Sequence, residues 1–201
     1  GATCSGFTST LLIQLKQTGG VDDGLVFAGV GSSGSTVRGL VVNSFLSDGI
    51  VFTNNANNNT VQCNYLGTNI SGTAAAANHT GLKLLDSSNN FIGTNGDGAN
   101  DANEGNLISG NSDSGISIDG TGTGNVVAGN RIGTNVAGTA IVANADFAGI
   151  FVPANGNRIG TNADGVSDAL EANLISGNSN AGVIMSGSNN TIAGNLLGMN
   201  A

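Results

Sequence analysis

Short sequence words recur along this chain of 201 residues. The segment NRIGTN begins at Asn130 and again at Asn157, and NLISGNS begins at Asn106 and again at Asn173. Repetition at intervals of about 20 to 50 residues is typical of solenoids, propellers and arrays, because each repeat buries its apolar face against its neighbours. The repeats therefore constrain the fold more than any single motif does.

Two kinds of unit alternate in the sequence. Segments 58–69, 123–135 and 189–200 share one pattern and mark an A unit, whereas 89–120 and 155–187 match each other and mark a B unit. Each unit spans about 30 to 35 residues, and the A and B pair repeats after about 65. We predict one domain, residues 1–201, with an N-terminal turn and weak cap at 1–34, a compact turn at 35–57, repeat pairs at 58–122 and 123–188, and an incomplete turn at 189–201.

Each unit divides into three short apolar segments, which in the second A unit are NVVAGN, RIGT and GIFV and in the second B unit NRIGT, NLISGN and GVIM. β-Branched residues favour strands, and Gly and Asn tolerate the left-handed backbone of sharp corners. Helices are not expected, because Gly, Asn, Ser and Thr rank low in helix interiors. The pattern predicts an all-β parallel solenoid with three short strands per turn and roughly seven turns, the last incomplete, stacked about 4.8 Å apart.

Side-chain positions follow from this arrangement. Ile132 and Ile159 are expected in neighbouring aliphatic stacks inside the coil. Asparagines recur near the corners, for example Asn64, Asn130 and Asn195, and predict ladders of side-chain amides that satisfy corner backbone groups. Such ladders would explain the asparagine content without an active site.

The charge balance excludes some partners. The net charge is −8, and the five basic residues are scattered: Lys16, Arg38, Lys83, Arg131 and Arg158. No basic patch can form from them, which argues against nucleic acid and against anionic membranes. No apolar run approaches the ~20 residues that span a bilayer, so no membrane insertion is expected. An acidic, weakly charged surface favours a secreted or cell-surface protein.

The two cysteines, Cys4 and Cys63, leave two states open. One disulfide would fit an oxidising compartment, and two free thiols fit the sequence equally well. Cys63 is expected about two turns inward, at ~4.8 Å per turn, so an intramolecular bridge requires the N-terminal segment to fold back.

The words STVRGLVVNSF, GNVVAGNRIGTN, GNLISGNS and NTIAGNLLG resemble the repeats of right-handed parallel β-helix proteins of the pectate-lyase-like superfamily, as found in large secreted bacterial surface proteins. The resemblance covers nearly the whole chain from about Ser9. It implies a right-handed, single-stranded parallel β-helix, in agreement with the crossover rule. It does not imply one function, because this superfold carries lyases, hydrolases, tailspikes, adhesins and spacers.

The enzymes of that superfamily require groups that the sequence does not place together. Arg131 and Arg158 both lie in the word NRIGT, at a position that other units fill with Tyr65 or Phe91, which indicates a variable surface position. The sole histidine, His79, has no acidic neighbour in the sequence. We therefore expect no enzyme.

Two acidic loops, NGDGANDANE and NADGVSDALE, are the candidate metal sites. Oxygen ligands in a flexible loop suit Ca²⁺, but the match to an EF-hand is poor, and the pattern favours a solvated acidic loop inherited by duplication over a Ca²⁺ site. The candidate ligands are Asn95, Asp97, Asp101 and Glu104 in the first loop and Asn162, Asp164, Asp168 and Glu171 in the second.

The ends of a solenoid are open sheet edges, which natural arrays cover. The last segment, NNTIAGNLLGMNA, stops within an A unit, which suggests either a cut from a longer array or end-to-end stacking of copies into a filament. We predict a structural or adhesive extracellular solenoid, the alternative being a polysaccharide-binding or polysaccharide-cleaving β-helix with Ca²⁺ in its acidic loops. An enzyme would need a carboxylate, a cation and a groove within one patch, whereas a spacer would show only periodic ladders.

Overall fold

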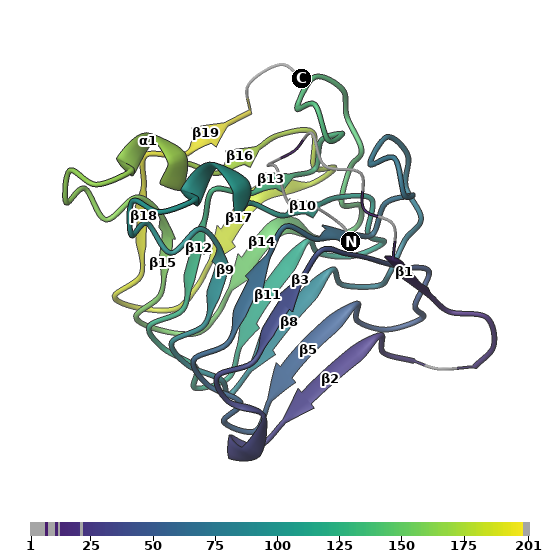
Figure 1. Ribbon diagram of the computed structural model, residues 1–201, viewed down its shortest axis with the longest axis horizontal. Coiled ribbons are helices and arrows are strands. Elements are labelled where there is room, and N and C mark those ends of the chain that lie inside the picture. The colour runs from purple at the N-terminus through teal and green to yellow at the C-terminus, as the bar shows by residue number, and fades with distance from the viewer. Residues whose placement is uncertain (1–6, 8–10, 12, 21, 199–201) are drawn as a thin grey trace.

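The computed structural model describes residues 7, 11, 13–20 and 22–198 and shows a parallel β-helix with three strands in each turn (Figure 1). Each strand from β1 to β16 pairs in parallel with the strand three positions further along the chain. Within the described residues six turns are complete, and β19 begins a seventh. The predicted solenoid is confirmed, and its right-handed sense stays a prediction.

Three sheets form the sides of the coil. Sheet 1 contains β1 (Ile13–Lys16), β4 (Leu40–Asn43), β7 (Tyr65–Leu66), β10 (Leu107–Ile108), β13 (Arg131–Ile132), β16 (Leu174–Ile175) and β19 (Leu196–Leu197). Sheet 2 contains β2 (Leu25–Ala28), β5 (Ile50–Thr53), β8 (Leu82–Leu85), β11 (Ile116–Asp119), β14 (Ala148–Val152) and β17 (Ala181–Met185). Sheet 3 contains β3 (Thr36–Arg38), β6 (Thr60–Gln62), β9 (Phe91–Gly93), β12 (Val126–Ala128), β15 (Arg158–Gly160) and β18 (Thr191–Ala193).

The sequence predicts no helix, and the structure corrects this with three single helical turns in loops. They are η1 (Val30–Ser32), η2 (Asp101–Asn103) and α1 (Asp168–Glu171). The last two lie in the acidic loops, where an aspartate occupies the first turn of each and suits the partial positive charge of a helix N-terminus. Such short turns depend on hydrogen bonds within their loops and hardly on helix propensity. Amino-acid composition therefore does not reveal them.

The two unit types carry their loops at different corners. In A units the loop follows the sheet 1 strand, at residues 67–81 and 133–147, and in B units it follows the sheet 3 strand, at 94–106 and 161–173. Loops of one kind therefore lie two turns apart, about 10 Å, which gives their side chains room. They nevertheless touch, because the Val136 amide donates to the Gly72 carbonyl at 2.8 Å, and Figure 1 shows the helical turns of the two acidic loops side by side.

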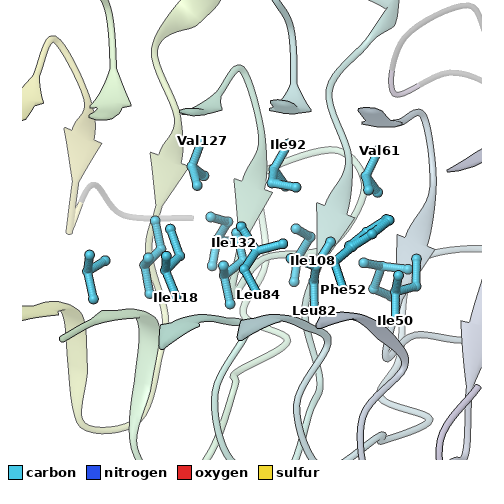
Figure 2. Packing of buried hydrophobic residues seen from close by; sticks show 14 of the residues in the cluster. Ile50, Phe52, Val61, Leu82, Leu84, Ile92, Ile108, Ile118, Val127 and Ile132 are labelled. Atoms are coloured by element: carbon cyan, nitrogen blue, oxygen red, sulfur yellow. The ribbon is translucent and has the colours of Figure 1, made fainter. Parts of the chain in front are cut away.

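The interior is a set of aliphatic columns that run through successive turns (Figure 2). In sheet 1 the column includes Leu66, Ile108, Ile132 and Ile175, each at most 1% exposed. Ile159 stands in the sheet 3 column and is also fully buried, so both isoleucines of the repeated word lie inside as predicted. Full burial of such a side chain stabilises the fold by roughly 1.5–3 kcal/mol.

An asparagine ladder lines each corner. Between sheets 3 and 1 the side-chain amides link Asn64, Asn106, Asn130, Asn173 and Asn195, with Nδ2 to Oδ1 distances of 3.1, 2.9, 3.0 and 2.8 Å. The predicted ladder is confirmed. The other two ladders run through Asn78, Asn111, Asn144 and Asn178 between sheets 1 and 2 and through Asn59, Asn90, Asn125, Asn157 and Asn190 between sheets 2 and 3.

Glycine is required where each acidic loop leaves sheet 3. Gly93 and Gly160 have φ values of 97° and 98°, in the region that residues with a Cβ atom rarely adopt. A Cβ atom on Gly93 would lie 1.9 Å from the Ala128 carbonyl oxygen of the next turn. Gly160, the glycine in the second copy of the repeated word, therefore marks a tight corner.

The outer face of sheet 1 is covered on the side toward the N-terminus. Leu11 is fully buried and packs with Val41, Cys63, Tyr65 and Leu107. Cys63 is disulfide-bonded, and the other cysteine of the sequence, Cys4, lies outside the described residues. The bonded state of Cys63 decides between the two states that the sequence leaves open.

Candidate functional site

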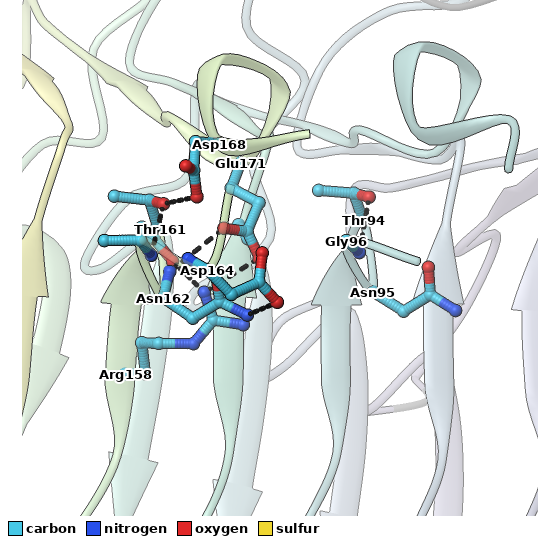
Figure 3. A network of polar contacts seen from close by, with 12 residues as sticks. Thr94, Asn95, Gly96, Arg158, Thr161, Asn162, Asp164, Asp168 and Glu171 are labelled. Carbon is cyan, nitrogen blue, oxygen red and sulfur yellow. Dashed lines mark hydrogen bonds and ion pairs between the residues drawn. The ribbon is translucent and has the colours of Figure 1, made fainter. Parts of the chain in front are cut away.

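The second acidic loop is closed by hydrogen bonds among its own residues. Thr161 Oγ1 donates to Asp168 at 2.7 Å, the Asn162 amide donates to Glu171 at 3.0 Å, and Asn162 Nδ2 donates to Asp164 at 2.9 Å (Figure 3). The four predicted metal ligands of this loop therefore all take part in closing it, but they do not converge on one point. They hold the loop's own hydroxyl and N–H groups.

The first acidic loop repeats the same pattern. Thr94 Oγ1 donates to Asp101 at 2.5 Å, the Asn95 amide donates to Glu104 at 3.4 Å, and Asn95 Nδ2 donates to Asp97 at 2.9 Å. The two B units, which match in sequence, therefore also form the same loop structure. The acidic residues recur at the same offsets and make the same closing hydrogen bonds in both loops.

One contact distinguishes the loops. Glu171 is fully buried, and its Oε1 forms a 2.9 Å ion pair with Arg158, visible in Figure 3. The first loop has Phe91 where the second has Arg158, and its Glu104 is 7% exposed. Arg158 stands in sheet 3 and Arg131 in sheet 1, so the arginines of the repeated word belong to different columns. Arg158 has a structural partner that the sequence interpretation missed.

The electrostatics of Asp101 fit this structural role. Burial opposes ionisation, but hydrogen bonds from Ser167, Thr94 and the Gly98 and Gly96 amides outweigh it and lower the pKa of Asp101 below its ordinary 3.8. The Ser167 contact joins the first loop to the second. Throughout the described part of the chain, no three His, Cys, Asp or Glu residues are placed to hold a metal ion. The Ca²⁺ prediction stays a prediction without support from the geometry.

A second cluster lies on the outer face of sheet 2, where no site was predicted. We call it the sheet 2 groove, a hollow of about 420 Å³ lined by Ser47, Asp48, His79, Thr80, Lys83, Asp113, Ser117, Asp119, Phe147 and Phe151. Lys83, Ser117 and Phe151 follow one another in the outward-facing column of β8, β11 and β14. Corner segments supply the rest of the lining apart from Asp119.

The asparagine ladder between sheets 1 and 2 positions those corner segments. The Asn111 amide donates to Asn144 Oδ1 at 3.2 Å, and Asn78 Nδ2 donates to Asn111 Oδ1 at 3.2 Å. Successive corners also pair directly, because the Asp113 amide donates to the His79 carbonyl at 2.9 Å. Since the ladder fixes the height of each corner, His79, Asp113 and Phe147 stand over one another at the edge of the groove.

An ammonium between two carboxylates occupies the floor of the groove. Lys83 Nζ lies 3.9 Å from Asp48 Oδ2 and 3.9 Å from Asp119 Oδ2. Ser117 Oγ donates to Asp119 at 2.7 Å and fixes that carboxylate. Burial raises the pKa of Asp48 above 3.8, while the Thr80 hydroxyl, Lys83 and His79 oppose the rise. The groove therefore combines buried polar groups with charges of both signs.

Two aromatic rings form one wall. Phe147 and Phe151 meet edge to face with their centroids 4.8 Å apart, and Phe147 is 36% exposed. Aromatic faces of this kind offer an apolar platform beside the polar floor. A carboxylate, a cation and a groove thus occur within one patch.

The sequence interpretation missed this site because its members lie far apart in the chain. It found no acidic neighbour for His79, whereas the fold brings Asp48 and Asp113 to the same groove. An alignment of the units that placed Lys83, Ser117 and Phe151 at one outward position could have revealed the site. Equivalent positions there change chemical type from turn to turn, unlike the aliphatic columns.

Comparison with known proteins adds no further assignment. No family model matches the chain, and no curated protein and no solved structure matches it either. In the described residues, no helix is long and apolar enough to cross a membrane.

Proposed function

We propose that this chain is an adhesive extracellular β-solenoid that holds a polysaccharide in the sheet 2 groove. The observation that carries the proposal is the convergence of Lys83, Asp48 and Asp119 with Phe147 and Phe151 in one hollow. Sugars are bound by hydrogen bonds to hydroxyls together with apolar contact to their ring faces, and the groove offers both.

The extent of the groove across successive turns also suits a chain ligand. The groove is open, and strands β8, β11 and β14 carry its side chains at the regular spacing of a sheet. An extended polymer can therefore contact successive turns. The repeated words and the three-sheet coil support a relation to the pectate-lyase-like superfamily, and bonded Cys63 supports an oxidising, secreted or cell-surface location.

The test is binding of the chain to a panel of polysaccharides by affinity electrophoresis. Phe147→Ala is expected to weaken retention roughly tenfold, because it removes the exposed ring of the wall. The matched control is Ile141→Ala, which removes a 66% exposed apolar side chain from the same loop outside the groove. Equal thermal unfolding of both variants shows that the fold is retained.

Two results would overturn this proposal. One is a native chain that binds none of the polysaccharides, and the other is a Phe147→Ala variant that is retained as strongly as the native chain. The proposal is that the chain binds the polysaccharide without cleaving it. Shorter oligosaccharides in the incubated mixture would show instead that the chain is an enzyme. Calorimetric titration with Ca²⁺ tests the acidic loops separately, and no heat and no thermal shift would end the calcium prediction.

A second function, end-to-end self-association, is favoured by the last described turn. Ile192 and Leu197 continue interior columns yet are 43% and 54% exposed, and a hollow of about 430 Å³ lies beside them. A further turn of the same chain or the end of another copy would cover these side chains, and we propose a second copy as the partner. Leu197→Lys should abolish assemblies detected by sedimentation velocity and electron microscopy, whereas Ile141→Lys should not, and a monomeric native chain at high concentration would refute the idea.

A further inference from the structure

The sheet 2 groove carries an excess of negative charge. Asp48, Asp113 and Asp119 line it against the single ammonium of Lys83, which leaves two negative charges when His79 is neutral and one when His79 is protonated. The net charge of the chain, −8, has the same sign. A polymer of uronic acids would therefore be repelled on approach, and a cationic polymer would be attracted.

The groove already accommodates one ammonium group. Lys83 Nζ lies 3.9 Å from a carboxylate oxygen of Asp48 and 3.9 Å from one of Asp119. Asp48 comes from the preceding turn and Asp119 from the following turn. Asp48 and Asp119 are thus engaged by the chain itself. A ligand ammonium requires a different carboxylate.

Asp113 is that carboxylate. It is half-buried at the groove edge, and Ser114 Oγ donates to it at 3.2 Å. The segment of Phe147 is joined to that of Asp113 by a hydrogen bond from the Asp146 amide to the Ser112 carbonyl at 3.2 Å. Asp113 and the exposed ring of Phe147 line the same hollow from adjacent turns, and a carboxylate and an aromatic ring are the two groups that attract an ammonium, through an ion pair and a cation–π contact.

The surrounding groups suit a sugar better than a lysine-rich peptide. The hydroxyls of Thr80 and Ser117 and the rings of Phe147 and Phe151 line the same hollow. The β8, β11 and β14 backbones pair with one another, so this face offers side chains and no free strand edge for a peptide backbone. The ligand chemistry that matches is a ring with hydroxyls and an ammonium substituent.

Building on the proposed polysaccharide binding, we infer that the groove selects a polymer of amino sugars with free, protonated amines, and that Asp113 and Phe147 hold the ammonium. N-acetylation of the sugar removes the positive charge and the ion pair. Uronic acid units reverse the charge.

The experiment compares hexasaccharides of glucosamine, N-acetylglucosamine and galacturonate by calorimetry at about pH 6, where amines of the first are largely protonated. We expect the glucosamine hexamer to bind at least roughly tenfold more tightly than the acetylated one and the galacturonate hexamer not to bind. Asp113→Asn should weaken glucosamine binding roughly fivefold to tenfold and leave the acetylated hexamer unchanged. Asp146→Asn, at an exposed position outside the groove lining, is the control with the same charge change and should have no effect.

The outcomes separate this inference from the proposed function. Equal binding of the acetylated hexamer, or tighter binding of galacturonate, overturns the inference and leaves polysaccharide binding intact. A lysine hexapeptide that binds as tightly as the glucosamine hexamer overturns it in favour of a peptide ligand. Failure of every sugar, in this panel and in the polysaccharide panel, overturns both.

Discussion

Asn130 is the residue on which the corner between sheets 3 and 1 depends most. It is 1% exposed, and its Oδ1 accepts from the backbone amide and Nδ2 of Asn106 at 3.0 and 2.9 Å. Its Nδ2 donates to the Ile92 carbonyl at 2.7 Å, the Ala128 carbonyl at 3.0 Å and Asn173 Oδ1 at 3.0 Å. Asn130→Ala removes all of these contacts at once.

The free energy of unfolding should fall by about 4 kcal/mol. The buried amide of Asn106 loses its acceptor, which costs about 1–3 kcal/mol, and each further lost hydrogen bond contributes about 0.5–1.5 kcal/mol before relaxation. Asn195→Ala is the matched control. Asn195 accepts from Asn173 and donates to the Ile159 carbonyl in the same way, but it is half-exposed in the last described turn, so water can replace the amide. We expect a loss of about 1 kcal/mol there.

Equilibrium unfolding in urea measures both variants. Repeat arrays can lose two-state behaviour, so the slope with denaturant must stay unchanged for the midpoints to be compared. Losses that agree within about 0.5 kcal/mol, or a loss below about 1 kcal/mol for Asn130→Ala, would refute the reasoning, because the ladder would then contribute no more inside the array than at its end.

The remaining predictions concern the acidic loops and their corners. Gly93→Ala should lower the free energy of unfolding by at least about 2 kcal/mol more than Gly165→Ala, since both have positive φ but only Gly93 meets backbone of the next turn; equal losses in urea unfolding would contradict this. Arg158→Met should cost about 3 kcal/mol by leaving Glu171 buried and charged, and thermal unfolding should show partial recovery when Glu171→Gln is added. The lowered pKa of Asp101 stabilises the fold at pH values above its unfolded-state pKa of about 3.8, and this contribution is lost as the pH falls through the folded-state pKa. Asp101→Asn should therefore flatten the acid side of a plot of urea midpoint against pH, and an unchanged plot would refute the assignment.

Much of the fold could be predicted from the sequence because its causes are local. The alternation of Val, Ile and Leu with polar residues places Ile132 and Ile159 inside, and the recurrence of Asn64 and Asn130 predicts the ladder that the structure contains. The acidic loops are a partial success. Their equivalence was predicted, but their hydrogen bonds serve loop closure, and the partner of Glu171 lies thirteen positions away in a strand.

The sequence alone determined the solenoid, its three strands per turn and the alternation of two unit types, since each of these follows from apolar periodicity and corner residues repeated within one turn. Only the tertiary structure decided where a ligand site lies. The groove joins Asp48, Lys83, Asp119 and Phe151 from four turns, and their contact depends on how the hydrogen-bond register stacks corners of unequal length. Loops absorb the differences in length, so which side chains face one another across turns is set by sheet pairing and by the asparagine ladders, and spacing in the chain does not reveal it.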